Sequence, residues 1–298
     1  FRTLNVVSEG NNESAGYTVP ADIQTQINTH RDAQASLRNY VTVETVSTET
    51  GSRVYQKRST LTGFAQVAEN GKIPAADAPQ FEQKTFTIKK YGGYIPVTNE
   101  LLADSSANIT ANLTAHIGNE DRVTENKLIL AASKGAKAAV TITALDGIKD
   151  IINKKLGSTF RPTSVIHTND DGLAWLDTLK ASDGRYLLTP VPSDPEHLQL
   201  SVGAVMIPVN VLPNKDLASD TTTTAGSTII PFIIGDLKEG VKLYDRQSTS
   251  IRASQDASVT DYNAFEQDGM LFRVTVRKDV EVVDSDAFYV ANLTVAGE

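Results

Sequence analysis

The sequence of 298 residues contains no cysteine, so disulfide bonds and thiolate metal sites are excluded. Any stapling of the fold must therefore come from packing or from oligomerisation. The sequence also has no apolar run close to the roughly 20 residues that are needed to cross a bilayer. We therefore expect no membrane span.

Positive charge is in the minority, with 28 Lys and Arg against 36 Asp and Glu and a formal net charge of -8. A protein that grips nucleic acid along a broad surface gains affinity by placing Lys and Arg on phosphates, so this balance argues against that class. The pairs Lys89-Lys90 and Lys154-Lys155 are interpreted as solvated surface. Hydrophobic residues make up 40% of the chain, which is ordinary for a globular protein, and the length indicates two domains.

Patterns for catalysis and metal binding are missing as well. No two of the four histidines are spaced for a shared metal ion, and there is no G-x-S-x-G nucleophile elbow. Gly71-Lys72 is followed by Ile73, so the phosphate-loop pattern fails for want of the Ser or Thr and the upstream Gly. We expect no catalytic residue, no metal and no cofactor, and therefore no enzyme.

Residues 1–37 are polar and interrupted by Gly10 and Gly16, which predicts an extended arm with a short helix over residues 23–31. Such an arm is usually disordered unless something ties it down, so we expect neighbouring subunits to hold it. The chain begins at Phe1 rather than at Met. Either a preceding segment was removed in nature or the chain was trimmed.

Residues 38–97 are predicted to form β-structure, because apolar and polar residues alternate over 40–44 and 81–88. Asn70-Gly71 is a strong turn signal. The pattern predicts a long two-stranded excursion with a polar tip. Since an isolated two-stranded ribbon is at best marginally stable in water, we expect this one to lie on another subunit.

Residues 98–134 carry the clearest helix, with apolar residues along about a third of its circumference. Thr98 or Asn99 can cap its start, Gly135 suits its end, and Gly118 is expected to kink it or to split it. The remaining elements are expected to be a helix over 144–156, a strand over 164–167, a helix that starts at Asn169 or Asp170, strands over 202–211 and 229–234, and further strands in 256–298.

Five segments, in this order along the chain, resemble the major capsid proteins of tailed bacteriophages of the HK97 type. They are SAGYTVP at 14–20, YGGYIPVTNELLADS at 91–105, DGRYLL at 183–188, IGDLKEGVKLYDR at 234–246 and NAFEQDGMLFR at 263–273. The resemblance implies an α+β, HK97-like capsid fold with an N-terminal arm at 1–38, an extended β-hairpin loop (E-loop) at 39–97, a peripheral (P) domain with a long spine helix at 98–139 and 256–298, and an axial (A) domain at 140–255.

The resemblance also implies a structural role in the virion. Copies of the mature chain would assemble in the host bacterial cytoplasm into hexamers and pentamers of an icosahedral head that encloses double-stranded DNA without sequence-specific binding. A portal, a scaffold segment and a protease would act during assembly, and a decoration or cement protein could bind afterwards. Phe1 in place of Met agrees with removal of the scaffold segment.

Some members of this family join neighbouring subunits covalently, when an E-loop Lys attacks an Asn side chain with help from a Glu. Lys57 and Lys72 lie in the loop, but Gly269 stands where the Asn belongs and Val276 where the Glu is needed. We therefore predict no such cross-link, so that shell strength comes from non-covalent overlap or from a separate cementing protein.

The residues expected to contact neighbouring subunits are Arg2, Arg53, Lys57, Arg58, Lys72, Phe81 and Arg246. Two other interpretations remain open at this point. One is an encapsulin-type nanocompartment shell protein, which shares the fold. The other, from a different class, is a two-domain α/β hydrolase or transferase with an unrecognised site.

Overall fold

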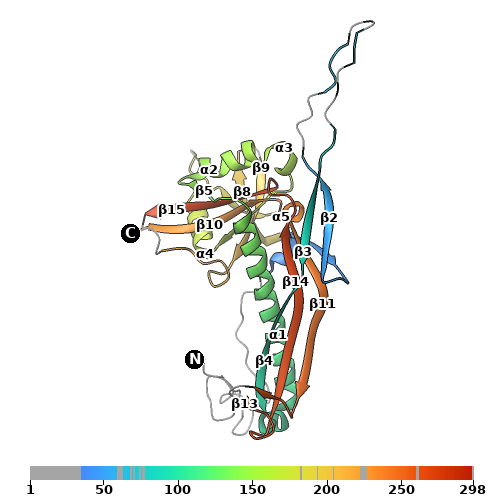
Figure 1. Cartoon of the computed structure of the whole chain (residues 1–298). Helices are drawn as coiled ribbons and strands as arrows, with labels where there is room; N and C mark the ends of the chain where they lie inside the picture. The colour runs from blue at the N-terminus through green and yellow to red at the C-terminus, as the bar shows by residue number, and fades with distance from the viewer. Residues whose placement is uncertain are drawn as a thin grey trace.

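The computed structural model describes residues 35–58, 63–67, 69, 71–73, 75, 78–181, 183–192, 194–203, 205–221, 227–259 and 262–296, without the side chains of 101–111, 196, 247, 248 and 296. The helix expected over residues 23–31 and the candidate contact Arg2 lie outside the described residues. Figure 1 shows an elongated molecule. A broad part with a seven-stranded sheet continues into a narrow part built along one long helix, and a thin two-stranded ribbon projects beyond both.

The broad part is built on a mixed sheet whose strand order is β5-β15-β10-β6-β9-β8-β7. Its strands are β5 (Val140–Ile142), β6 (Val165–Asn169), β7 (Leu188–Val191), β8 (Asp194–Val202), β9 (Val205–Leu212), β10 (Ser227–Gly235) and β15 (Phe288–Ala296). The helices beside it are α2 (Leu145–Asp150), its π-helical continuation η3 (Ile151–Lys155), α3 (Gly157–Phe160) and α4 (Asp170–Asp177).

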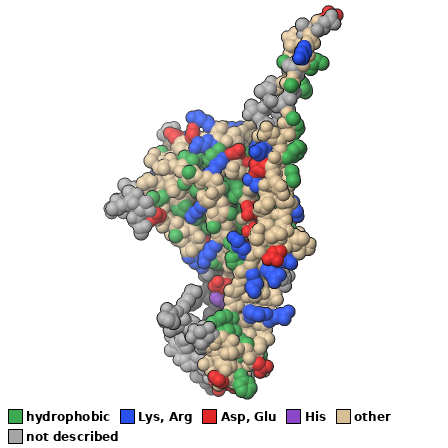
Figure 2. Space-filling model, viewed as in Figure 1, with side chains coloured by type: hydrophobic (Ala, Val, Ile, Leu, Met, Phe, Trp, Pro, Cys, Tyr) green, Lys and Arg blue, Asp and Glu red, His purple; other side chains and the backbone are tan. Residues whose placement is uncertain are grey.

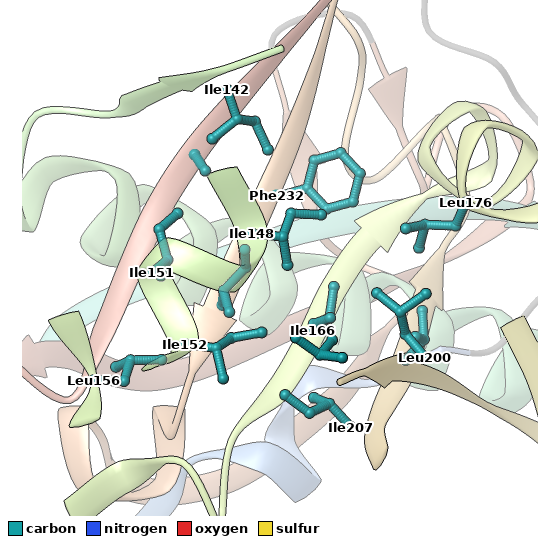
Figure 3. Packing of buried hydrophobic residues seen from close by; sticks show 14 of the residues in the cluster. Ile142, Ile148, Ile151, Ile152, Leu156, Ile166, Leu176, Leu200, Ile207 and Phe232 are labelled. Atoms are coloured by element: carbon teal, nitrogen blue, oxygen red, sulfur yellow. The ribbon is translucent and has the colours of Figure 1, made fainter. Parts of the chain in front are cut away.

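One hydrophobic cluster joins this sheet to its helices, as Figure 3 shows. Ile148 of α2 and Ile152 of η3 share a helix face, and both belong to the same buried cluster as the strand residues Ile166 and Phe232. Trp175 of α4 stands edge-on to the ring of Phe232, with the centroids 6.1 Å apart. Each such side chain contributes roughly 1.5–3 kcal/mol when it is fully buried, so this cluster supports a stable body.

The narrow part is a four-stranded sheet in the order β1-β11-β14-β4, and helix α1 packs along it. The strands are β1 (Thr42–Thr45), β4 (Lys89–Thr98), β11 (Val241–Ser254) and β14 (Gly269–Val282). Helix α1 (Asn99–Ala136) has 38 residues, and at a rise of about 1.5 Å per residue it is about 57 Å long. The far end carries a small sheet of β12 (Ser258–Val259) and β13 (Tyr262–Asn263).

The ribbon consists of β2 (Thr50–Gln56) and β3 (Phe81–Thr87), which pair antiparallel from Thr50 opposite Thr87 to Gln56 opposite Phe81. We call these strands and the residues between them the E-loop ribbon. Two short helices complete the described fold, namely the 3-10 helix η2 (Leu37–Tyr40), where the chain enters the body, and α5 (Leu237–Gly240), which leads from β10 to β11. The two-stranded excursion and the long helix predicted from the sequence are therefore present.

Charged side chains are buried where helix α1 meets the narrow sheet. Lys278 of β14 donates to Asp121 Oδ1 at 2.6 Å and to Glu125 Oε1 at 2.7 Å, both on α1. Arg38 in η2 pairs with Glu125 and with Asp245 of β11. This ion network joins the entry of the chain, the long helix and the sheet into one unit.

Helix α1 begins after Thr98 at the N-cap position, as expected, but it is not split at Gly118 and the Thr98 side chain does not cap it. Gly118 does not divide it, because α1 runs as one helix from Asn99 to Ala136. A single glycine costs a helix only about 1 kcal/mol relative to alanine, which packing along a whole sheet can outweigh. The side chain of Thr98 makes no capping hydrogen bond. Instead, the amide of Asn99 donates to the carbonyl oxygen of Asp268 at 3.0 Å.

The prediction of one strand over residues 202–211 is also wrong, because this segment contains the end of one strand and most of the next. Strand β8 ends at Val202 and β9 begins at Val205, because Gly203 takes a φ of 67° and turns the chain back on itself. A positive φ is easily adopted by glycine alone among ordinary residues. The turn places β8 antiparallel to β9, with Val202 opposite Val205.

The boundary between the two sheets does not coincide with the expected domain boundary between residues 255 and 256. Strand β11 pairs with β14 in the narrow sheet, although it comes from the segment 140–255. Strand β15 pairs with β10 in the broad sheet, although it comes from the segment 256–298. The chain therefore crosses between the two parts three times, between α1 and β5, between β10 and β11, and between β14 and β15.

Candidate subunit interface

The E-loop ribbon has one side toward the molecule and one side away from it, because successive residues of a strand point to opposite faces. Phe86 lies on the inner side, where it is buried and stacks on Tyr244 of β11 with the ring centroids 4.3 Å apart. The guanidinium of Arg53 lies 5.5 Å from the centroid of the Phe86 ring. The stack of Phe86 and Tyr244 is worth about 0.5–1.5 kcal/mol beyond the area that it buries.

An ion cluster at Glu44 holds the same side of the ribbon. Glu44 accepts from Arg53 Nε at 2.9 Å and from Lys242 Nζ at 3.0 Å. Burial would raise the pKa of the Glu44 carboxyl, but the hydrogen bonds from Arg53 and Lys242 outweigh it and hold that pKa below its usual value. The root of the ribbon is therefore fixed to β1 and β11 by both an aromatic and an ionic contact.

A carboxylate of β14 holds the end of β3. Asp279 Oδ2 accepts from the backbone amide of Thr87 at 2.8 Å, and Asp279 is buried. Glu281 follows two residues later on the same face, where burial and the charge of Asp279 raise its pKa. The ribbon thus leaves the narrow sheet at a fixed point.

Arg58 fastens the ribbon a second time, to the broad part of the molecule. Its Nε donates to Asp284 Oδ2 at 2.5 Å, and its guanidinium lies 4.3 Å from the centroid of the Phe160 ring in α3. Residues 63–67 and the other described residues toward the tip form no side-chain hydrogen bond or ion pair with the rest of the described chain. Beyond Arg58 the ribbon therefore has no visible support from its own body.

The outer side and the tip of the E-loop ribbon expose large apolar side chains. Val54 and Phe81 on the strands are 66% and 65% exposed, and Phe64 and Ile73 near the tip are 95% and 81% exposed. Figure 2 shows hydrophobic side chains along the ribbon, away from the body. The tip was expected to be polar, and Glu69 and Lys72 are exposed there, but the exposed apolar side chains of Phe64 and Ile73 nearby were not expected.

The other residues expected at an interface fall into two groups. Arg53 and Arg58 have the partners described above, and Arg246 donates to the carbonyl oxygen of Ser47 at 3.1 Å. Lys57 and Lys72 are exposed and have no side-chain partner among the described residues. Contact of any of them with a neighbouring subunit stays a prediction.

A set of contacts that hold the entry of the chain was not predicted from the sequence. Asn126 Nδ2 donates to the carbonyl oxygen of Ala35 at 2.9 Å, and its Oδ1 accepts from the amide of Leu37 at 2.9 Å. Asp216 Oδ2 accepts from Asn126 at 3.1 Å and from Arg122 at 3.2 Å. The sequence does contain a signal, since Asn126 lies one helical turn before the apolar residues Ile129 and Leu130, which are buried.

The positions that matter for the predicted absence of a cross-link are both buried. Gly269 carries no side-chain amide, and a Cβ atom placed on it would lie 1.7 Å from the hydroxyl oxygen of Tyr262. Val276 of β14 is 5% exposed and carries no carboxylate. Neither position supplies the acceptor or the proton-transfer group that the family reaction uses.

The described residues offer little else that could support chemistry. They contain no group of three or more His, Asp or Glu side chains placed to hold a metal ion, and none of their helices is long and apolar enough to cross a membrane. His167 is buried, which lowers its pKa to about 3, and its Nδ1 lies 3.0 Å from Asn210 Nδ2. It is a neutral packing residue, edge-on to Tyr40.

Comparisons with solved structures identify the fold. The chain is similar to the capsid of a native GTA particle, with a TM-score of 0.68, 18% identity, and coverage of 96% of this chain and 98% of that one. It is also similar to Mycobacterium phage Bobi, with a TM-score of 0.64, 13% identity, and coverage of 99% and 100%. For Microbacterium phage Oxtober96 the values are 0.62, 14%, 97% and 99%. These matches show an HK97-type capsid fold.

The sequence itself identifies the family. No curated protein matches the sequence. The model of the phage capsid family, however, matches residues 15–293, which is most of the chain. The chain therefore belongs to the phage capsid family and is a major capsid protein.

Proposed function

We propose that this capsid protein builds an icosahedral head from hexamers and pentamers of itself, around double-stranded DNA. The observation that carries the proposal is the E-loop ribbon, which exposes Val54, Phe81, Phe64 and Ile73. Leaving several large apolar side chains in water forgoes roughly 1.5–3 kcal/mol for each one that could be buried. A second copy that covers them recovers that free energy, and repetition around a symmetry axis closes a ring.

The division of the chain follows from the same proposal. The narrow part with α1 serves as the P domain, the broad part serves as the A domain around the symmetry axes, and the E-loop ribbon overlaps a neighbour. Residues 1–38 serve as the arm that a neighbour holds. A portal and a scaffold segment with its protease take part in assembly, and the head encloses DNA without reading its sequence.

The E-loop contacts are tested by removing apolar area from the outer side of the ribbon. The full chain with Val54→Ser and Phe81→Ser should remain folded but should no longer form shells. Both side chains are exposed in the lone subunit, so its thermal unfolding should stay close to that of the wild type. Electron microscopy and sedimentation velocity measure assembly, and circular dichroism measures folding.

Gln83→Ser is the matched control, because Gln83 is exposed and stands opposite Val54 on the same side of the ribbon. This variant should assemble as the wild type does. If the Val54→Ser, Phe81→Ser variant formed shells of normal size, the proposed contact between the ribbon and a neighbouring subunit would be contradicted. A wild-type chain that stays monomeric at high concentration would remove the proposed function itself.

A further inference from the structure

Four basic side chains stand together on the face of the narrow sheet that points away from α1. Lys278 of β14 points toward α1, so Arg273 and Arg277 point to the opposite face. The strand register places Arg252 of β11 directly opposite Arg273, and Lys90 of β4 directly opposite Arg277. We call these four residues the basic face.

The basic face is unfavourable in the lone subunit. Like charges placed directly opposite one another on neighbouring strands destabilise a sheet, and here two such pairs occur on one face. None of the four side chains has a hydrogen-bond or ion-pair partner within the described part of the chain. Small residues lie between the two pairs, since Gly92 is opposite Thr275 and Thr275 is opposite Ser250. The face is therefore positive, and its nearest carboxylate, that of Asp279 two residues beyond Arg277, accepts from the amide of Thr87 and forms no ion pair with the four basic side chains.

The end of the same sheet is acidic. Residues 253–272 contain no Lys or Arg, and Asp256, Glu266 and Asp268 are exposed there. Phe265 stands among these carboxylates and is 78% exposed. We call residues 256–259 and 262–268 the acidic tip. Figure 2 shows Asp and Glu side chains with a hydrophobic group at this end of the molecule, and a group of Lys and Arg side chains above them.

The acidic tip does not neutralise the basic face of its own chain. Gly269, which follows the tip, comes four positions before Arg273, and at about 3.3 Å per residue this is about 13 Å along β14. The Debye length at physiological salt is about 8 Å, so exposed charges at this separation are largely screened from each other. The acidic tip of the same chain therefore leaves Arg252 and Arg273 without a paired carboxylate.

We propose that the acidic tip of one copy of this chain docks on the basic face of a second copy. Phe265 would supply the apolar anchor beside Tyr94, which is 40% exposed and stands next to Arg273 on the basic face. The contact joins different surfaces of the two copies, so it is head-to-side and generates a closed ring when the rotation closes. The inference rests on the proposed function and adds to it a second contact, distinct from the E-loop ribbon.

A copy of the chain fits the basic face better than nucleic acid does. A phosphate backbone long enough to follow the sheet would also meet the acidic tip about 13 Å away, where every charged group repels it. The formal net charge of -8 opposes it further. The acidic tip, in contrast, carries complementary charge and an aromatic side chain on one short segment. Complementary charges of this kind fix register and speed association.

Charge exchange tests the contact. The full chain with Arg273→Glu and Arg277→Glu should need at least a tenfold higher concentration to assemble, and so should the chain with Asp256→Lys and Glu266→Lys. The variant with all four changes keeps the wild-type net charge and restores opposite charges across the contact, so it should assemble close to the wild-type concentration. Lys127→Glu, at an exposed position of α1, is the control for a charge change elsewhere.

The outcomes separate this contact from the proposed function. Assembly by the wild type, loss in both double variants and recovery in the fourfold variant would support the contact. Normal assembly of either double variant, or no recovery in the fourfold variant while all variants fold as monomers, would overturn it and leave the proposed function standing. A third outcome would also overturn the contact. In it, the wild type binds double-stranded DNA in a salt-dependent way, and the Arg273→Glu, Arg277→Glu variant loses this binding but assembles normally.

Discussion

The ammonium group of Lys278 lies 2.7 Å from a carboxylate oxygen of Glu125, and both side chains are enclosed between helix α1 and the narrow sheet. Both charges are almost completely removed from water, so they depend on their ionic partners, which also include Arg38 and Asp121. Removal of Lys278 leaves Glu125 with Arg38 alone, and removal of Glu125 leaves Lys278 with Asp121 alone. The pair therefore matters more for the stability of the spine than its surface counterparts do.

Lys278→Ala should lower the free energy of unfolding by about 3 kcal/mol, at the lower end of the range for a broken buried pair, because Glu125 and Asp121 lose a buried cation while Glu125 keeps Arg38. Lys137→Ala, which breaks the more exposed pair with Asp286, should cost at most about 1 kcal/mol. Urea unfolding of the unassembled subunit measures both values. Equal losses from the two variants would contradict the special position of Lys278.

Asn126→Ala should loosen the entry of the chain. The variant leaves the amide of Leu37 and the carbonyl oxygen of Ala35 without their Asn126 partner, and a buried polar group that loses its partner costs about 1–3 kcal/mol. Hydrogen exchange over residues 35–41 should speed up relative to the wild type. Asn153→Ala, at the surface beside Arg161, should change neither quantity. Unchanged protection of residues 35–41 would show that Asn126 does not hold the entry of the chain.

His167 should make the subunit sensitive to acid. Its pKa in the folded chain is about 3, against about 6.5 when it is exposed, so the unfolded chain binds one more proton throughout that window. Stability therefore falls as the pH drops from about 6.5 toward 3, and this residue alone accounts for about 2 kcal/mol at pH 5. His167→Gln should reduce the slope of unfolding free energy against pH by one proton between pH 6 and 4. An unchanged slope would contradict the burial of the imidazole.

Arg273→Thr should separate stability from assembly. The substitution removes a like-charge cross-strand pair with Arg252, and such pairs destabilise a sheet by about 0.2–1 kcal/mol. The lone subunit should therefore unfold at the same temperature or a slightly higher one, while assembly should weaken. A fall of more than about 1 kcal/mol in stability would show that Arg273 is bound within its own chain.

Much of the fold was predictable because the elements concerned carry strong local patterns. The apolar stripe of the long helix and the alternation over β3 were enough to predict both elements. Asn169 caps α4 as expected, since its side chain accepts from the amide of Gly172 at 2.9 Å. Strands β7 and β8 were not expected. They lie at one edge of the broad sheet, where half-exposed strands need no regular apolar pattern.

The candidate interface was predictable only in outline. The sequence indicated a ribbon that needs a partner, because no two-stranded excursion of that length is stable by itself. It did not indicate that Arg53 would bind Glu44 or that Arg58 would reach Phe160, since those pairs depend on where β1 and α3 lie in space. The basic face was also hidden, because Lys90, Arg252 and Arg277 are far apart in the sequence and meet only through strand register.

The close approach of Tyr262 to Gly269 limits how this shell could be strengthened by engineering. A designer who wished to weld subunits through an amide bond would begin by installing an asparagine at position 269. That single change drives the new side chain into the tyrosine hydroxyl, so the residue at 262 would have to shrink in the same step. A carboxylate would also be needed in place of Val276. Covalent reinforcement of this shell therefore requires three coordinated substitutions and cannot be reached by a single one.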